Sequence, residues 1–410
     1  MTPNPQSLGE RAATMIGELG AISAESNRLV RLFLTPEHRR AADLVTKWMQ
    51  EAGLAVDEDA LGTVRGRRGE GARLLIGSHI DTAIDAGKYD GPLGVIAGIV
   101  AVGELAKTGR SLPFGIDVLA FGDEEGSRFP ATFASSSACA GVFDRATLAL
   151  PDRDGVTLAD ALRKYGKNPA HIAAAAYRPQ DVVGYIEVHI EQGPRLEAEG
   201  RPLGVVTGIV GQSRLRVAVT GEAGHAGTVP MRLRRDALAG AAAMAQALEQ
   251  IASAHLEDDM VGTIWRIEVA PGAVNIIPGQ VSFTIDLLAL TDRLRLGAVQ
   301  RFQAEARRIA AARRLEVAFE LFHEVATAAM APKLQDGLAA SIAALGHQPM
   351  RLASGAGHDA QIMTQLCPAA MLFVRCRGGI SHNPAEFCSV ADMGLAIAAL
   401  IGFIERFKPD

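Results

Sequence analysis

Short apolar runs alternate with helical periodicity in the first part of the chain. The runs at 73–76, 116–121 and 182–190 are short and apolar, which is typical of buried strands. Residues 40–52 and 91–105 have the spacing or the apolar character of helices. Buried strands that alternate with helices favour an α/β fold with a mostly parallel sheet and helices on both faces. In such sheets the functional site forms at the carboxyl ends of the strands.

The pattern changes near residue 211, where polar and apolar residues begin to alternate. This alternation over 213–220 predicts a half-buried strand of an antiparallel sheet. The elements predicted next are a helix at 235–254, strands at 262–269 and 280–288, a helix at 292–313 and a strand at 315–324. The order of these six elements is ferredoxin-like, so we expect a small α+β unit here.

The first pattern returns after Pro332, with a helix at 335–344, a strand at 370–374 and a helix at 390–407. The α+β unit is therefore predicted to be an insertion. We expect one domain from residues 1–211 and 324–410, and an inserted domain from residues 212–323. Two domains also suit the length, because 410 residues are more than one hydrophobic core usually supports.

Composition excludes several classes of function. Charged residues make up 21% of the chain, the net charge is -5, and no basic stripe indicates nucleic-acid binding. The apolar run at 93–102 is too short to span a bilayer, and residues 1–17 do not resemble a signal peptide. The four cysteines form no Cys-x-x-Cys pair, so neither a zinc ribbon nor a disulfide framework is indicated. We expect a soluble protein of the cytoplasm.

Seven short motifs are rich in histidine and acidic residues, and most lie where a predicted strand ends. They are GSHIDT at 77–82, GKYDG at 87–91, DEEGSR at 123–128, HIEQGP at 189–194, GHAGT at 224–228, GHDA at 357–360 and SHNPAE at 381–386. Each motif alone has an ordinary alternative, such as a hydrogen-bonded core histidine or a solvated turn. Together they predict a buried cluster that would repel itself unless cations sat in it. The sequence therefore favours a metal site, and one with two metals.

The spacing within the motifs suggests how such a site could work. His79 and Asp81 share a face of an extended strand, so Asp81 could orient a ligating His79. Asp90 precedes a predicted helix, whose N-terminus favours an anion. Glu124 and Glu125 are adjacent and point apart, so one could bind metal while the other faces the substrate. No Gly-x-Ser-x-Gly nucleophile motif is present, and residues 355–360 match a dinucleotide fingerprint only loosely.

In this order the motifs resemble those of the M20 family of metal-dependent amidohydrolases and peptidases. The HIEQGP and SHNPAE motifs are similar to those of its hydantoinase/carbamoylase branch, which includes N-carbamoyl-L-amino-acid hydrolases, β-ureidopropionases and allantoate amidohydrolases. The resemblance implies hydrolysis of a linear amide or ureido C–N bond with two divalent ions per subunit. Zn²⁺ is the implied ion, and Mn²⁺, Co²⁺ or Ni²⁺ are the alternatives.

The resemblance also implies roles for individual residues. The implied metal ligands are His79, Asp90, Glu125, His189 and His382, with Asp90 bridging the two ions and Asp81 behind His79. Glu124 would be the general base. The implied substrate contacts are Gln192, His225, Asn275, Gly357 and His358. The inserted domain would act as a lid and form a homodimer, in which His225 reaches the partner's site and stabilises the oxyanion.

One departure from the family pattern affects the substrate. Relatives that act on N-carbamoyl amino acids or allantoate usually carry an arginine that grips the substrate carboxylate, and Leu288 stands at that position here. Leucine cannot pair with a carboxylate. Either the substrate has no carboxylate there, or another cation substitutes. The candidates are Arg128, Arg214, Arg375 and Arg377. We favour a neutral or unusually shaped amide or ureide.

Two other functions remain open on the sequence. An M20-type aminopeptidase or aminoacylase would cleave a peptide or acyl bond, but Gln192 and a histidine at 189 disfavour it. A non-catalytic binding protein on the same scaffold would need to have lost a ligand or the base. Glu124 and all five implied metal ligands are present.

Overall fold

The computed structural model describes residues 4–255 and 259–409. The chain divides into two compact units, one formed by Met1–Thr207 with Ala329–Asp410 and the other by Gly208–Ala328. The second unit is thus an insertion between two parts of the first. Its observed limits are residues 208 and 328, where 212 and 323 were expected.

A nine-stranded mixed sheet forms the centre of the first unit. Its strands are β1 (Ala55–Glu58), β2 (Val64–Arg68), β3 (Arg73–His79), β4 (Gly115–Phe121), β5 (Val182–Ile190), β6 (Leu203–Ile209), β13 (Ala328–Ala329), β14 (Met350–Ser354) and β15 (Ala369–Val374). The main path runs β1-β2-β4-β3-β5-β15-β6-β13, and β14 pairs with β6. The pairs β3–β4, β3–β5 and β5–β15 are parallel, and β1–β2, β2–β4 and β6–β15 are antiparallel.

The helices of this unit are spread along both of its segments. They are α1 (Pro5–Gly20), α2 (Pro36–Glu51), α3 (Pro92–Lys107), α4 (Ala134–Ala140), α5 (Leu158–Lys164), α6 (Arg195–Ala198), α9 (Pro332–Ala344), α10 (Asp359–Met363) and α11 (Val390–Arg406). Short 3-10 helices occur at η1 (Arg145–Ala149), η2 (Pro169–Ala175), η3 (Pro179–Asp181) and η6 (Arg377–Gly379). The alanine-rich stretch near residue 171 belongs to η2.

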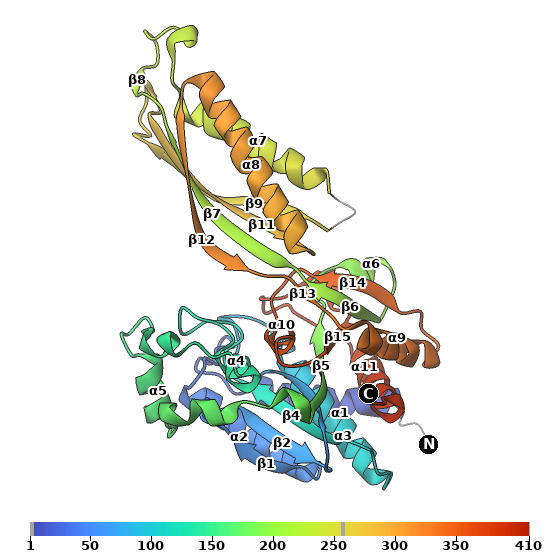
Figure 1. The fold of residues 1–410 in the computed structure, drawn as a ribbon. Helices are drawn as coiled ribbons and strands as arrows, with labels where there is room; N and C mark the ends of the chain where they lie inside the picture. The colour runs from blue at the N-terminus through green and yellow to red at the C-terminus, as the bar shows by residue number, and fades with distance from the viewer. Residues whose placement is uncertain (1–3, 256–258, 410) are drawn as a thin grey trace. The chain divides into compact units, whose positions relative to one another are not determined.

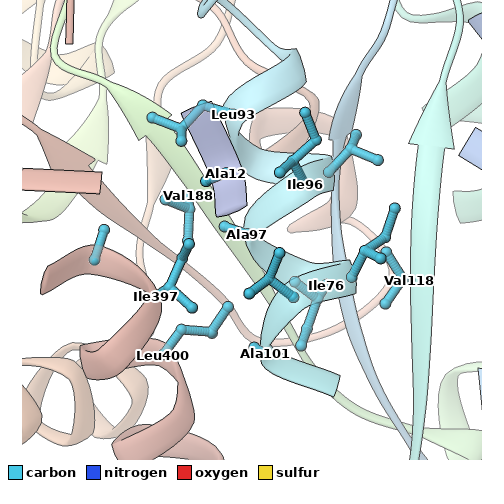
Figure 2. Packing of buried hydrophobic residues seen from close by; sticks show 14 of the residues in the cluster. Ala12, Ile76, Leu93, Ile96, Ala97, Ala101, Val118, Val188, Ile397 and Leu400 are labelled. Atoms are coloured by element: carbon cyan, nitrogen blue, oxygen red, sulfur yellow. The ribbon is translucent and has the colours of Figure 1, made fainter. Parts of the chain in front are cut away.

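One face of the sheet packs against α3 and α11, and α1 packs against these two helices (Figure 1). Figure 2 shows this packing at close range: Ile96 and Ala97 of α3 lie among Ile76, Val118 and side chains of α11. Nearly every residue of α3 is buried, which explains why its sequence is apolar all round. The core on this face therefore fixes the strands whose ends carry the polar motifs.

The other face of the sheet packs against α10, which contacts both β5 and α4. Alternation along β5 separates the two faces, because Ile186 and Val188 enter the first core while Glu187 and His189 point the other way. Glu187 accepts a hydrogen bond from the backbone N–H of Ala360 in α10 at 2.8 Å. The predicted helices on both faces are thus confirmed, and buried polar residues are concentrated on the α10 face.

The inserted unit contains a four-stranded antiparallel sheet in the order β12-β7-β11-β9. Its elements are β7 (Gly211–Thr220), β8 (Gly224–His225), η4 (Met231–Leu233), α7 (Ala237–Ser253), β9 (Val261–Ala270), β10 (Ile276–Ile277), β11 (Gln280–Ala289), α8 (Asp292–Arg313) and β12 (Glu316–Val325). Helices α7 and α8 cover one face of the sheet (Figure 1). Leu215, Val217 and Val219 point into this core, as the alternation predicted. The strand order and connections are ferredoxin-like.

The predicted fold class is confirmed, with one difference in the sheet. The antiparallel strands β1, β2 and β6 flank the parallel centre and were not anticipated. Strand β1 is short and only partly buried, so it lacks the apolar run by which the other strands are recognised. Among the described residues, no helix is both long enough and apolar enough to cross a membrane.

Candidate metal centre

The carboxyl ends of three parallel strands bring the acidic and histidine motifs together. His79 is the last residue of β3 and pairs with Phe121, the last residue of β4. Acidic residues 123–125 follow β4 directly, and His189 lies one residue before the end of the neighbouring β5. Because parallel strands end at the same edge of a sheet, the residues converge as the sequence predicted.

Asp90 lies at the centre of these motifs, and its two carboxylate oxygens have different neighbours. Its Oδ1 is 3.1 Å from Nε2 of His189 and 3.5 Å from Nε2 of His79. Its Oδ2 is 3.4 Å from Nε2 of His382, and that same nitrogen is 3.4 Å from Oε2 of Glu125. Asp90 is buried, with 3% of its surface exposed. Each oxygen of the Asp90 carboxylate therefore faces a different group of possible metal ligands.

The two buried imidazoles are oriented by backbone carbonyls. Nδ1 of His189 lies 2.9 Å from the carbonyl oxygen of Ile190, and Nδ1 of His79 lies 3.2 Å from that of Asp81. A carbonyl oxygen can only accept a hydrogen bond, so each Nδ1 must carry the proton. With a divalent cation bound between each ring and Asp90, Nε2 would present its lone pair to that cation, which is the tautomer that a metal-ligating histidine needs.

Asp81 positions both the first histidine and the two glutamates. Its Oδ1 lies 3.3 Å from Nδ1 of His79. The same carboxylate accepts the backbone N–H groups of Glu124 at 3.2 Å and of Glu125 at 3.3 Å. This holds the turn after β4 against the end of β3. Glu124 Oε2 consequently lies 3.9 Å from Nε2 of His79, beside the ligand groups.

Burial and mutual repulsion disturb the ionisation of these groups. Burial raises the pKa of Glu124 well above its ordinary value, and burial together with Asp90 raises the pKa of Glu125 to about 7. Burial also disfavours the charged form of Asp90, but the neighbouring His189 holds the Asp90 pKa well below its usual range. The hydrogen bond to Asp90 raises the pKa of His382 to about 9. Divalent cations among these groups would stabilise every carboxylate in its charged form.

The donor atoms fit a pair of cations. Among the described residues, two groups that share Asp90 have ligand atoms within 4.8 Å of one another: His79 with His189, and Glu125 with His382. Nε2 of His79, Nε2 of His189 and Oε1 of Glu125 are buried and have no hydrogen-bond partner there. Buried polar atoms are rarely left unpaired, so these atoms fit coordination to a metal.

Strained backbone occurs at several of the predicted residues. Gln192, His382 and Asn275 have φ angles of 57°, 51° and 64°, a region that residues other than glycine rarely adopt. Such conformations cost about 1–3 kcal/mol each and are concentrated at functional sites. In the first unit, this geometry brings Nε2 of Gln192 within 2.7 Å of Asp90 Oδ2 and 3.3 Å of Ser381 Oγ.

The other predicted substrate contacts lie in both units. In the first, Gly357 and His358 precede α10, and the His358 ring centre lies 4.4 Å from that of His189. Nδ1 of His358 is buried and has no partner among the described residues. In the inserted unit, β8 pairs with β10 so that His225 and Asn275 lie together, joined by the hydrogen bond from Ala226 N–H to the carbonyl oxygen of Asn275.

A comparison with known families identifies the scaffold. Residues 75–406 match the model of peptidase family M20/M25/M40. The chain belongs to this family. It is 40% identical to allantoate deiminase of Arabidopsis thaliana, covering 97% of this chain and 82% of that protein. It is 38% identical to N-carbamoyl-L-amino acid amidohydrolase of Geobacillus stearothermophilus, covering 96% and 97%. An amidase of the hydantoinase/carbamoylase family from Burkholderia multivorans has a similar structure, with a TM-score of 0.90, 33% identity and 97% of each chain covered.

The resemblance stated from the motifs is thereby confirmed for this M20 family chain. Four arginines were considered as substitutes for the arginine expected at position 288. Three of them are engaged with acids: Arg128 with Asp152, Arg214 with Asp286 and Arg375 with Asp392. Arg377 stacks over Phe387 at 4.3 Å and has no carboxylate within 4.0 Å among the described residues. Leu288 itself is half-buried on β11, opposite Gln212 and Val261.

The sequence analysis assigned no role to several residues that support the site, although Ser78 and Asp123 lie within its motifs. Ser78 Oγ donates to Glu187 beneath the two histidines at 2.9 Å, and Asp123 accepts the backbone N–H groups of Ala134 and Ser135 at the start of α4. Glu386 was part of a recognised motif, but its contacts could not be foreseen. The partners of Ser78 and Glu386 lie more than 100 positions away in the chain, so no local spacing reveals these contacts.

Gly91 offers a test of the ligand geometry. Its φ is 79°, and a Cβ there would lie 2.4–2.6 Å from three atoms of the His79 ring. We expect Gly91→Ala to displace His79 and to weaken metal binding at least about tenfold, as measured by competition with a chelator. Gly155→Ala is a matched control, because Gly155 has a φ of 80° and its Cβ would meet no atom within 4 Å. Equal metal affinity in the two variants would contradict the geometry.

Proposed function

We propose that this protein is a metal-dependent hydrolase of a linear amide or ureido C–N bond, of the N-carbamoyl-amino-acid or allantoate amidohydrolase type. The observation that carries the proposal is the bridging position of Asp90, with Glu124 beside the two ligand groups. The names of the relatives from Arabidopsis and Geobacillus support the reaction class. A cytoplasmic location stays a prediction.

The proposed ligands divide into two sets around Asp90. His79 and His189 would hold one divalent ion with Asp90 Oδ1, and Glu125 and His382 the other with Asp90 Oδ2. When bound, two such ions supply Lewis-acid polarisation of a carbonyl and lower the pKa of a water. Zn²⁺ suits the imidazole and carboxylate donors, with Mn²⁺, Co²⁺ or Ni²⁺ as alternatives.

Glu124 is proposed to move the proton that the reaction transfers. Its carboxylate takes a proton from the attacking water, whose oxygen forms a bond to the amide or ureido carbonyl carbon. The same proton then passes from Glu124 to the nitrogen as the C–N bond breaks. A carbamoyl substrate would yield an amine and carbamate, and carbamate decays to carbon dioxide and ammonia. Nothing is oxidised or reduced.

Two variants distinguish the proposed role of Glu124 as a base from that of Glu125 as a metal ligand. We expect Glu124→Gln to lower kcat by about 10²–10⁴ while the protein still binds two ions, because Glu124 moves protons rather than ligating. Glu125→Ala should lose one ion, because it removes a proposed ligand. Ammonia release and elemental analysis of the purified proteins measure the two effects. The assignment is wrong if Glu124→Gln loses metal or if Glu125→Ala keeps both ions.

The inserted unit is proposed to form a homodimer and to supply His225 to the partner's site. Strand β9 lies at an edge of its sheet, and Val261, Trp265 and Ile267 on it are each more than half exposed. A long apolar edge strand is a ready surface for pairing with another chain. His225 is itself exposed on β8, which suits a side chain that acts outside its own unit. There it would stabilise the oxyanion of the attacked carbonyl.

A hybrid dimer tests whether His225 acts across the interface. We expect Glu124→Gln and His225→Ala to be nearly inactive as separate proteins, the latter by about 10²–10³ in kcat. Co-expressed with different tags and purified as a hybrid, they should regain about half of the wild-type activity, because one site then has both groups. A hybrid as inactive as its parents, or a protein that is monomeric by light scattering, would contradict the proposal.

We further propose that the substrate lacks a carboxylate where Leu288 stands. Leu288 offers no charge, and its cross-strand neighbours Gln212 and Val261 offer none either. Leaving a carboxylate unpaired against such a surface would cost several kcal/mol. Arg377 is the alternative cation, because it has no acidic partner among the described residues.

A substrate panel decides between these alternatives. We expect neutral ureides and amides to be hydrolysed with a higher kcat/KM than ordinary N-carbamoyl-L-amino acids, allantoate, N-acyl amino acids or dipeptides. Leu288→Arg should raise kcat/KM for the carboxylates by about tenfold or more, since a bidentate pair adds one to two kcal/mol. The idea fails if the wild-type enzyme prefers an N-carbamoyl-L-amino acid. If Arg377→Ala then abolishes that preference, Arg377 is the substitute.

A further inference from the structure

Glu386 joins two segments that are far apart in the sequence and each carry a proposed ligand. The segment before α3 contains Asp90, and the segment before α11 contains His382. Oε1 of Glu386 accepts the backbone N–H groups of Tyr89 at 2.9 Å and of Asp90 at 3.1 Å. These hydrogen bonds span nearly 300 positions of the chain and fix the backbone of the residue that faces both ligand groups.

The second oxygen of Glu386 completes a closed network. Ser381 Oγ lies 3.2 Å from Glu386 Oε2 and 2.8 Å from Asp90 Oδ2, so it connects the two carboxylates. Gln192 donates to Asp90 Oδ2 as well. The Asp90 carboxylate is therefore held from its backbone side by Glu386 and from its side-chain side by Ser381 and Gln192.

Packing around Glu386 shows that the two segments are fitted to each other. Glu386 is buried, with 5% of its surface exposed. A Cβ on Gly87 would lie 2.3 Å from both Cβ and Oε1 of Glu386, so only glycine leaves room for the carboxylate. Next to it, the rings of Tyr89 and Phe387 meet edge-on with centroids 6.0 Å apart. A buried acid beside another acid is costly, which argues for a role other than stability.

We propose that Glu386 is a positioning residue that latches the Asp90 segment to the His382 segment and so sets the spacing between the two groups of ligands. The latch rests on the proposed metal centre. Glu386 is not proposed to contact the reacting atoms. It acts through the two hydrogen bonds that it accepts from the backbone N–H groups of Tyr89 and Asp90. A carboxamide in its place keeps an acceptor for both N–H groups and can donate to Ser381, whereas a methyl group keeps neither.

The test measures how tightly ions are held rather than turnover alone. Zn²⁺-loaded protein is titrated with a chelator, and retained metal is measured by elemental analysis. We expect Glu386→Ala to hold its ions at least about tenfold more weakly than the wild type, the usual effect of losing a residue behind a metal ligand. Glu386→Gln should restore most of the affinity. Gly87→Ala, which crowds Glu386 without removing it, should weaken binding as well.

A matched control separates latching from general loss of structure. Asp59 is also a buried acid, and its Oδ1 accepts the backbone N–H groups of Leu61 and Thr63 at 2.8 and 3.1 Å, but it belongs to none of the seven motifs. Asp59→Ala should leave metal affinity close to that of the wild type.

Each other outcome has a distinct meaning. If wild-type protein binds no ions, the proposed function fails before the latch is tested. If the wild type binds two ions and Glu386→Ala or Gly87→Ala holds them equally tightly, the latch is wrong. If Glu386→Gln loses ions as readily as Glu386→Ala, the charge of Glu386 matters and its positioning role is overturned.

Discussion

The carboxylate of Asp90 is the constraint on which the arrangement of the first unit depends. It is buried where three parallel strands end, with imidazoles facing Oδ1 and the Glu125–His382 pair facing Oδ2. Such a concentration of acids in a protein interior is unstable unless cations balance it. The proposed pair of cations would explain why unpaired imidazole nitrogens and strained backbone conformations gather at this place.

Residues from several distant segments of the chain hold the Asp90 carboxylate and its neighbours in place. The apolar core between the sheet and helices α3 and α11 places the strand ends, and Asp81 then ties the turn after β4 to His79. Gly91 leaves space for the His79 ring at the start of α3, and Glu386 ties the segment that carries His382 to the segment that carries Asp90. The geometry of the site therefore depends on backbone hydrogen bonds, and on glycines that leave room for neighbouring side chains, as much as on the proposed ligands.

Much of this could be predicted from the sequence because the signals are local. The alternation of polar and apolar residues over 213–220 predicted strand β7. Helix α8 begins and ends at the residues expected from its pattern. His79, Glu125 and His189 could be singled out because they lie at or just after the ends of apolar runs. The antiparallel strand β1 escaped because it is short and half-exposed, and the contacts of Glu386 escaped because they cross nearly 300 residues. Long-range pairing leaves no periodic trace in a single sequence.

The central claim is that Asp90 bridges two divalent ions. A crystal structure of Zn²⁺-loaded protein, recorded at the zinc absorption edge, tests it most directly. The account predicts two anomalous peaks per subunit, one bound by Asp90 Oδ1 with His79 and His189, the other by Asp90 Oδ2 with Glu125 and His382. A single peak, or peaks that leave Asp90 uncoordinated in protein that hydrolyses its substrate, would contradict it.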